Sequence, residues 1–173
     1  MKIFLKLSAC VVPAVAYGLM LVLYPFSPVT FALGIPVCLW LSSLFHELGH
    51  LTAYLLLKLK WKRIVISFFV FDTERGFYFD GQRSIFSASC TCVYSPRIPF
   101  WRYCVALLGG GILCGLLGIA TILLSLTATG SLAAFLQCFG LISLVNAAAT
   151  LLLPFNPDRT LLRQIRNERE KRP

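Results

Sequence analysis

Charged residues are scarce in this sequence. They make up 13% of the 173 residues, whereas hydrophobic residues make up 58%. A soluble domain carries about a quarter charged residues, so this composition argues against an ordinary soluble protein. The mean hydropathy of +0.79 favours the lipid bilayer as the solvent. The formal charge of +9 is explained by lysines and arginines that flank membrane spans, and we expect no nucleic-acid partner.

Long apolar runs take the place of the missing charges. A membrane helix needs about 20 predominantly apolar residues. Proline and glycine turns separate four such runs, and we predict membrane helices at residues 7–24, 29–58, 104–126 and 132–153. Residues 64–79 are β-branched and aromatic around a polar turn, which predicts a short β-hairpin at the membrane surface. The expected fold is therefore an all-α membrane protein, a single domain of residues 1–173, with this hairpin between helices two and three and a polar loop at 81–103.

Lysine and arginine are missing from one side of this predicted fold. The turns at 25–28 and 127–131 contain neither residue, so all 16 lie near the two termini, in the 58–103 segment or in the basic tail at 159–173. The positive-inside rule makes that side cytoplasmic. We expect an integral, multi-pass protein of a bacterial cell membrane with both termini in the cytoplasm. The tail suits an anionic lipid surface.

Histidine is also scarce, and its placement is informative. The chain has only His46 and His50, both within the predicted helix 29–58. Side chains four residues apart share one face of a helix, so the two imidazoles can bind the same metal ion. Glu47 is placed to take a proton from a metal-bound water. Ionisable residues within a membrane span are costly and indicate a functional site.

A catalytic zinc site commonly has three protein ligands and one open position, so the two histidines need a partner. Asp158 is expected at the cytoplasmic end of the fourth helix, the side on which the histidines also lie. Its neighbours favour an ordinary helix-ending turn as the competing interpretation. Other acids and thiols remain as alternatives. They are Asp72, Glu74 and Asp80 in the hairpin, and Cys90 and Cys92, which we otherwise interpret as free thiols.

Two motifs together resemble a known family. His46-Glu47-Leu48-Gly49-His50, followed near the end of the fourth helix by Asn156-Pro157-Asp158, is similar to the site-2 protease family of intramembrane zinc metalloproteases. The resemblance covers about residues 29–160 and is to a small member without a PDZ domain. One difference is Arg159, which stands where the family usually has glycine.

The resemblance implies a function and a set of roles. His46, His50 and Asp158 would bind zinc (Zn2+), Glu47 would be the catalytic base, and Asn156 would hold the substrate or the oxyanion. The substrate would be a membrane-spanning or membrane-associated peptide, cut within or near the bilayer. We expect such a peptide to add as a strand to the edge of the 64–79 hairpin.

Two other functions remain open at this stage. The first is a non-proteolytic metal-binding membrane protein, such as a degenerate protease-like subunit with an immunity or sensing role. The presence of Glu47 disfavours it. The second is a small transporter or channel subunit. It is disfavoured because a single buried acidic residue provides little of the path that a transported substrate needs. Nothing in the sequence indicates the oligomeric state.

Overall fold

We describe the protein from a computed structural model. The structure describes residue 15 and residues 28–66, 68–82, 88–95, 97–153 and 157–170. The predicted first helix at 7–24, apart from Val15, and the predicted site residue Asn156 lie outside the described residues.

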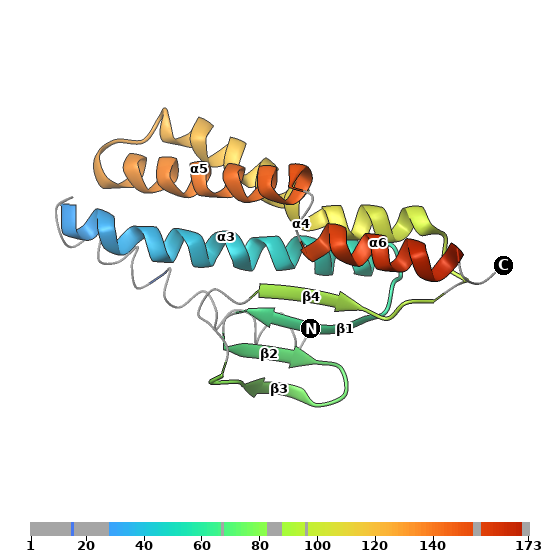
Figure 1. Cartoon of the computed structure of the whole chain (residues 1–173). Coiled ribbons are helices and arrows are strands. Elements are labelled where there is room, and N and C mark those ends of the chain that lie inside the picture. Colours follow the sequence, from blue (N-terminus) through green and yellow to red (C-terminus); the bar gives the residue numbers. More distant parts are fainter. Residues whose placement is uncertain are drawn as a thin grey trace.

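Three long helices form one layer of the described chain (Figure 1). They are α3 (Pro28–Leu56), α4 (Phe100–Ser125) and α5 (Gly130–Leu152). All three are long and apolar enough to cross a membrane. They correspond to three of the four predicted helices, and their outer faces expose large apolar side chains such as Leu116 and Val145. Such faces are suited to lipid, which supports membrane association.

Glycines bring α3 and α4 into backbone contact. A Cβ atom added at Gly49 would lie 2.5 Å from the carbonyl oxygen of Gly109, and one at Gly109 would lie 2.8 Å from the carbonyl oxygen of Gly49. No side chain fits between backbones this close, so glycine is required on both helices. Small residues commonly allow this approach between membrane helices, where packing replaces the hydrophobic effect as the driving force.

A four-stranded antiparallel sheet follows α3. Its order is β3-β2-β1-β4, and its strands are β1 (Trp61–Ile66), β2 (Phe69–Asp72), β3 (Gly76–Phe79) and β4 (Ala88–Cys92). The chain leaves α3 through Lys58, whose φ of 54° is left-handed, and Gly76 has a φ of 78° at the turn into β3. The sheet packs against the C-terminal half of α3, where Tyr54, Ile64 and Ile66 are fully buried.

The predicted all-α fold is therefore wrong. The β-structure is a four-stranded sheet that reaches residue 92, not a short hairpin at 64–79, and in the described chain it comes before the second long helix, α4. The missed strand β4 has the sequence Ala-Ser-Cys-Thr-Cys, which is short and shows little hydrophobic pattern. It becomes a strand by pairing with β1, from Trp61↔Cys92 to Ile66↔Ala88. Such pairing is non-local, so the segment alone gives no signal for it.

The basic tail forms the fourth described helix. Helix α6 (Pro157–Glu170) is shorter and more polar than the other three and is not among the candidate spans. It lies beside α4, with Ile165 buried against the core. At its far end, Arg169 donates a hydrogen bond to the carbonyl of Ile98 and lies over the ring of Phe100. Figure 1 shows α6 at the end of the layer where α3 finishes and α4 begins, which brings its first turn toward the histidines.

Candidate metal centre

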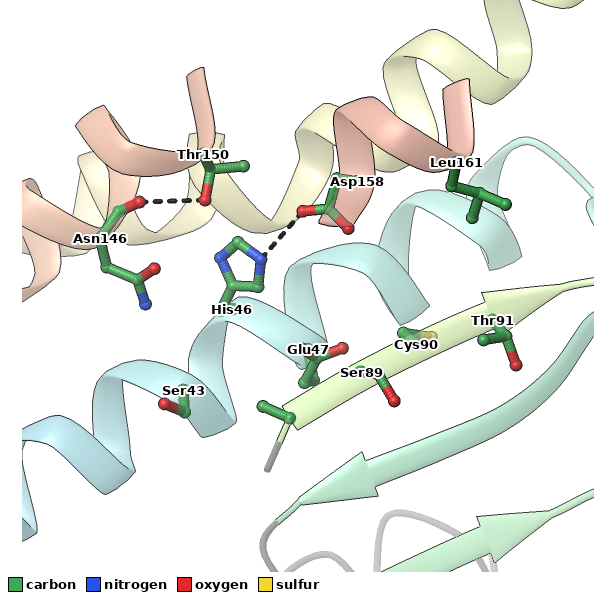
Figure 2. A pocket seen from close by; sticks show the side chains of 11 residues that line it. Ser43, His46, Glu47, Ser89, Cys90, Thr91, Asn146, Thr150, Asp158 and Leu161 are labelled. Carbon is green, nitrogen blue, oxygen red and sulfur yellow. Dashed lines mark hydrogen bonds and ion pairs between the residues drawn. The ribbon is translucent and has the colours of Figure 1, made fainter. Parts of the chain in front are cut away.

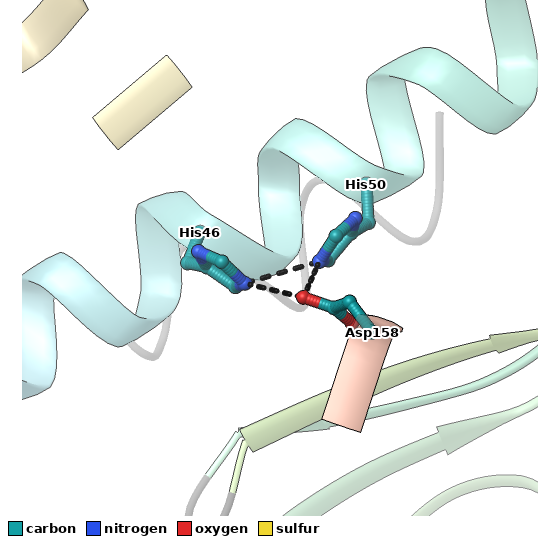
Figure 3. A group of neighbouring side chains, drawn as sticks. All are labelled: His46, His50 and Asp158. Atoms are coloured by element: carbon teal, nitrogen blue, oxygen red, sulfur yellow. Dashed lines mark hydrogen bonds and ion pairs between the residues drawn. The ribbon is translucent and has the colours of Figure 1, made fainter. Parts of the chain in front are cut away.

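His46 and His50 point at the same position in space. Both project from one face of α3, and their Nε2 atoms lie 3.1 Å apart. The Oδ2 atom of Asp158, from the first turn of α6, lies 3.4 Å from each of these nitrogens. Figure 3 shows the two rings and the carboxylate converging. Among the described residues, these three side chains form the group that could hold a metal ion.

The spacing of these three atoms fits a small tetrahedral ion. Ligand atoms about 2.0–2.1 Å from a tetrahedral zinc ion are roughly 3.3 Å from one another. The observed separations of 3.1, 3.4 and 3.4 Å match that edge length. Two nitrogens and one oxygen form a common catalytic donor set, and three ligands leave one position open.

The outer nitrogens of both rings have partners that fix their orientation. His50 Nδ1 lies 2.9 Å from the carbonyl oxygen of Ala106, which can only accept, so Nδ1 carries the proton. His46 Nδ1 lies 4.0 Å from the Cys114 sulfur, and that thiol itself donates to the carbonyl of Ser42. The Nε2 atom of a neutral His50 ring therefore presents its lone pair toward the position that it shares with His46 and Asp158. Such outer partners are typical of metal-binding histidines.

Gly110 forms the wall of the site on α4. A Cβ atom at this position would lie 2.6 Å from His50 Nε2 and 2.8 Å from His46 Nε2. Any side chain would occupy the space where the ligand atoms meet. The sequence contains a signal for this contact, because Gly109, Gly110 and Gly111 are consecutive in a membrane helix. That run fits helix packing equally well, and only the structure assigns one of the three to the metal centre.

Glu47 lies beside the histidines and is buried, with 3% of its surface exposed. Its Oε2 atom has no hydrogen-bond partner among the described residues. Figure 2 shows Glu47 on the side of α3 that faces β4, in a cavity of about 340 Å³ that also contains His46 and Asp158. A buried carboxylate oxygen without a partner is costly, and it is therefore suited to a ligand or water that enters the cavity.

Asp158 lies in the first turn of α6, beside the two histidines of α3. Burial would raise the pKa of its carboxyl, but the adjacent imidazoles of His46 and His50 outweigh burial and lower that pKa. The adjacent Arg159 donates a hydrogen bond to the carbonyl of Leu151, at the end of α5. This contact ties the start of α6 to α5, and the last carbonyls of a helix otherwise lack partners. Arg159 thus has a defined structural role at the start of α6.

The other candidate ligands lie elsewhere or point elsewhere. The Asp72 carboxylate accepts hydrogen bonds from the Glu74 and Arg75 backbone N–H groups and, at 3.0 Å, from the Arg63 guanidinium. Cys90 and Cys92 lie in β4 as free thiols, and burial raises the pKa of both. Cys90 lines the cavity with the metal group but does not belong to that group.

Sequence reasoning missed several residues of the cavity. Strand β4 contributes a wall to it, and α5 contributes two polar side chains, Asn146 and Thr150. Asn146 is a polar residue within an apolar span, a signal that could have pointed to the site.

No protein-family model, no curated protein and no solved structure matches this chain. The similarity to site-2 proteases therefore stays a prediction that rests on the motif residues.

Proposed function

We propose that this protein is an intramembrane zinc metalloprotease of the site-2 protease kind, which hydrolyses peptide bonds of membrane-spanning or membrane-associated peptides. The observation that carries the proposal is the convergence of His46, His50 and Asp158 on one position, beside a cavity that Glu47 lines together with His46 and Asp158. Residues far apart in the chain supply a complete ligand set and a carboxylate base. A site with a metal-binding role alone would not need Glu47 buried beside it.

Each residue has a chemical role in this proposal. His46, His50 and Asp158 hold zinc, which when bound polarises the scissile carbonyl and lowers the pKa of a water molecule. The Glu47 carboxylate accepts a proton from the attacking water and passes it to the nitrogen of the leaving amine. The carbonyl of Ala106 orients His50, and Gly110 leaves room for both imidazoles. Asn156, the proposed contact to the substrate or oxyanion, lies outside the described residues.

Water must reach such a site from one side of the membrane. Helix α3 carries the histidines in its C-terminal half, and the basic segments after α3 and in α6 lie at the same end of the layer. By the positive-inside rule we place this end in the cytoplasm.

A substrate helix must unwind before cleavage, because its own hydrogen bonds protect its peptide groups. In the sheet order β3-β2-β1-β4, the predicted docking edge on the 64–79 segment corresponds to β3, and the other edge of the sheet is β4. Strand β4 lines the cavity with Ala88, Ser89, Cys90 and Thr91 (Figure 2). We therefore propose β4 as the edge to which an extended substrate adds.

The variant Glu47→Gln tests the function directly. The chain is co-expressed with a library of tagged, single-span membrane peptides, and truncated products are sought. We expect products with the wild type and none with Glu47→Gln, while both proteins contain equal zinc. Glu74→Gln, which changes an exposed acid in the turn before β3, is the matched control and should leave cleavage unchanged. If Glu47→Gln gives the same products, Glu47 is not the base. Bound zinc without products from any peptide would favour the non-proteolytic alternative.

A further inference from the structure

A second cavity adjoins the metal site between helices α3 and α5. Its volume is about 530 Å³. Its walls are mostly apolar and include Leu39 on α3 and Leu141, Ile142, Val145 and Ala149 on α5. Leu141 and Val145 are 58% and 68% exposed, so the groove opens sideways, toward the surroundings of the helices. In a membrane those surroundings are lipid tails.

Two polar residues join this groove to the metal cavity. Ser43 and Asn146 line both spaces. In the view of Figure 2, His46 is drawn between Asn146 on one side and Asp158 on the other. The groove therefore borders the cavity in which we propose that the reaction occurs.

Asn146 bridges the two helices at this junction. Its Nδ2 atom donates a hydrogen bond to Ser42 Oγ, at 3.1 Å, and Ser42 is buried. A side-chain amide has two N–H donors and a carbonyl oxygen that accepts, so this bond leaves one N–H group and the carbonyl oxygen. The remaining two are the pair of groups that recognises a peptide unit, which also offers one donor and one acceptor.

We propose that the groove is the subsite that selects the substrate, with a large apolar side chain next to the scissile bond filling it and the Asn146 amide hydrogen-bonding the backbone of the same segment. This inference rests on the proposed peptidase function. The occupant follows from two observations: the apolar groove opens sideways, where a membrane would surround it with lipid, and it borders the cavity that His46, Glu47 and Asp158 line. Asn146 would supply the polar partner that an unwound peptide lacks in lipid.

Binding of metal-chelating probes tests the groove without requiring cleavage. The probes are acetohydroxamate, which has no side chain, and dipeptidyl hydroxamates that carry a methyl, isobutyl or naphthylmethyl group beside the chelating end. Affinity for the zinc-loaded protein is measured in lipid nanodiscs. A site that accommodates extra methylenes discriminates by about 10-fold or more per group. We expect the wild type to prefer isobutyl over methyl by at least about 10-fold on that basis.

Filling the groove should remove this preference. Ala149→Phe places a ring in the groove, and we expect all dipeptidyl probes to bind it with similar affinity. Leu116→Phe, on the exposed face of α4 and away from the groove, is the matched control and should keep the wild-type preference. Val145→Phe is a second filling variant in case Ala149→Phe does not fold. Acetohydroxamate should bind to all four proteins equally.

A second pair of variants distinguishes two roles of Asn146, which are hydrogen bonding to the probe and packing of α5 against α3. Asn146→Ala removes the amide, and we expect it to weaken the dipeptidyl probes by about 10-fold while acetohydroxamate is unaffected. Ser42→Ala removes the same interhelical hydrogen bond but keeps the amide, so its dipeptidyl affinities should stay near those of the wild type. Equal losses in both variants would show that Asn146 only packs the helices.

Other outcomes would overturn the inference in ways that differ from failure of the proposed function. A wild type without side-chain preference, or an Ala149→Phe variant that retains it, would mean that the groove holds lipid and not substrate. Absence of acetohydroxamate binding would overturn the metal site and the subsite together. Side-chain-dependent binding combined with no cleavage of any peptide would overturn the peptidase function alone.

Discussion

Gly110 lies directly against His50: a Cβ atom at Gly110 would be 2.6 Å from the Nε2 atom that faces the metal position. The contact joins helix α4 to the ligands on α3 at a distance that only hydrogen can occupy. It makes the backbone of α4 a wall of the metal centre, and it ties helix packing to the proposed chemistry.

Substitution Gly110→Ala should therefore weaken metal binding strongly. The new methyl group would displace both imidazoles from the position that they share with Asp158. We expect zinc affinity, measured by chelator competition, to fall by more than about 10-fold. Gly115→Ala is the matched control on the same helix, because its Cβ would meet only Ala147 at an ordinary 3.6 Å, and it should bind zinc normally. Wild-type zinc affinity in Gly110→Ala would contradict the position of the site.

Zinc content after substitution of single residues should distinguish Asp158, as a ligand, from the other acidic residues. We expect Asp158→Asn and His50→Ala each to lower zinc content strongly, because a site with three protein ligands cannot spare one. Asp72→Asn should leave zinc content unchanged, since that carboxylate is engaged with Arg63. Metal analysis of the purified proteins measures this. Full zinc content in Asp158→Asn would mean that the third ligand is another residue.

The contact between Arg159 and the end of α5 should affect the metal through Asp158. Arg159→Gln shortens the side chain that donates to the Leu151 carbonyl, so the first turn of α6 is held less firmly. We expect zinc affinity to fall by about 10-fold, in the range for partners that orient a ligand. Arg163→Gln, an exposed arginine one turn later, controls for the loss of positive charge and should have no effect. Equal losses of zinc affinity in the two variants would mean that the positive charge matters, and not the placement of Asp158 by Arg159.

The Arg63–Asp72 pair predicts a pH dependence of sheet stability. The pKa of Asp72 is lowered by the Glu74 N–H group first and by the Arg63 guanidinium next. Because the folded pKa lies below the unfolded value of about 3.9, the charged form stabilises the fold above that pH. The contribution is lost as the pH falls toward the lowered folded value.

Comparison with Asp72→Asn isolates this contribution. The variant lacks the titrating group, so the wild type should have the higher thermal unfolding temperature at pH 7, with the difference shrinking below about pH 4. A difference that stays constant across this range would contradict the assignment. Glu74→Gln, which changes an exposed acidic side chain in the turn before β3, is the control.

Local sequence patterns accounted for the helices and half of the site. Residues 28–56, 100–125 and 130–152 form helices within a few residues of the predicted bounds, because long apolar composition acts on each segment independently. The spacing of His46 and His50 likewise follows from helix geometry alone. The sheet was only partly predictable: β1, β2 and β3 have aromatic and β-branched residues, whereas β4 depends on β1 as its partner.

The sequence by itself determined that the protein suits a membrane and that two imidazoles and a carboxylate share one turn of an apolar helix. Tertiary structure decided which acid joins them. By residue type, Asp72, Glu74, Asp80 and Asp158 were all eligible, and only the return of α6 onto α3 and α4 brings Asp158 Oδ2 to 3.4 Å from both histidines. It also decided that Gly110 lies against both imidazoles and that Asn146 lines both the cavity beside them and an apolar groove. These placements depend on packing between distant segments, which no local pattern specifies.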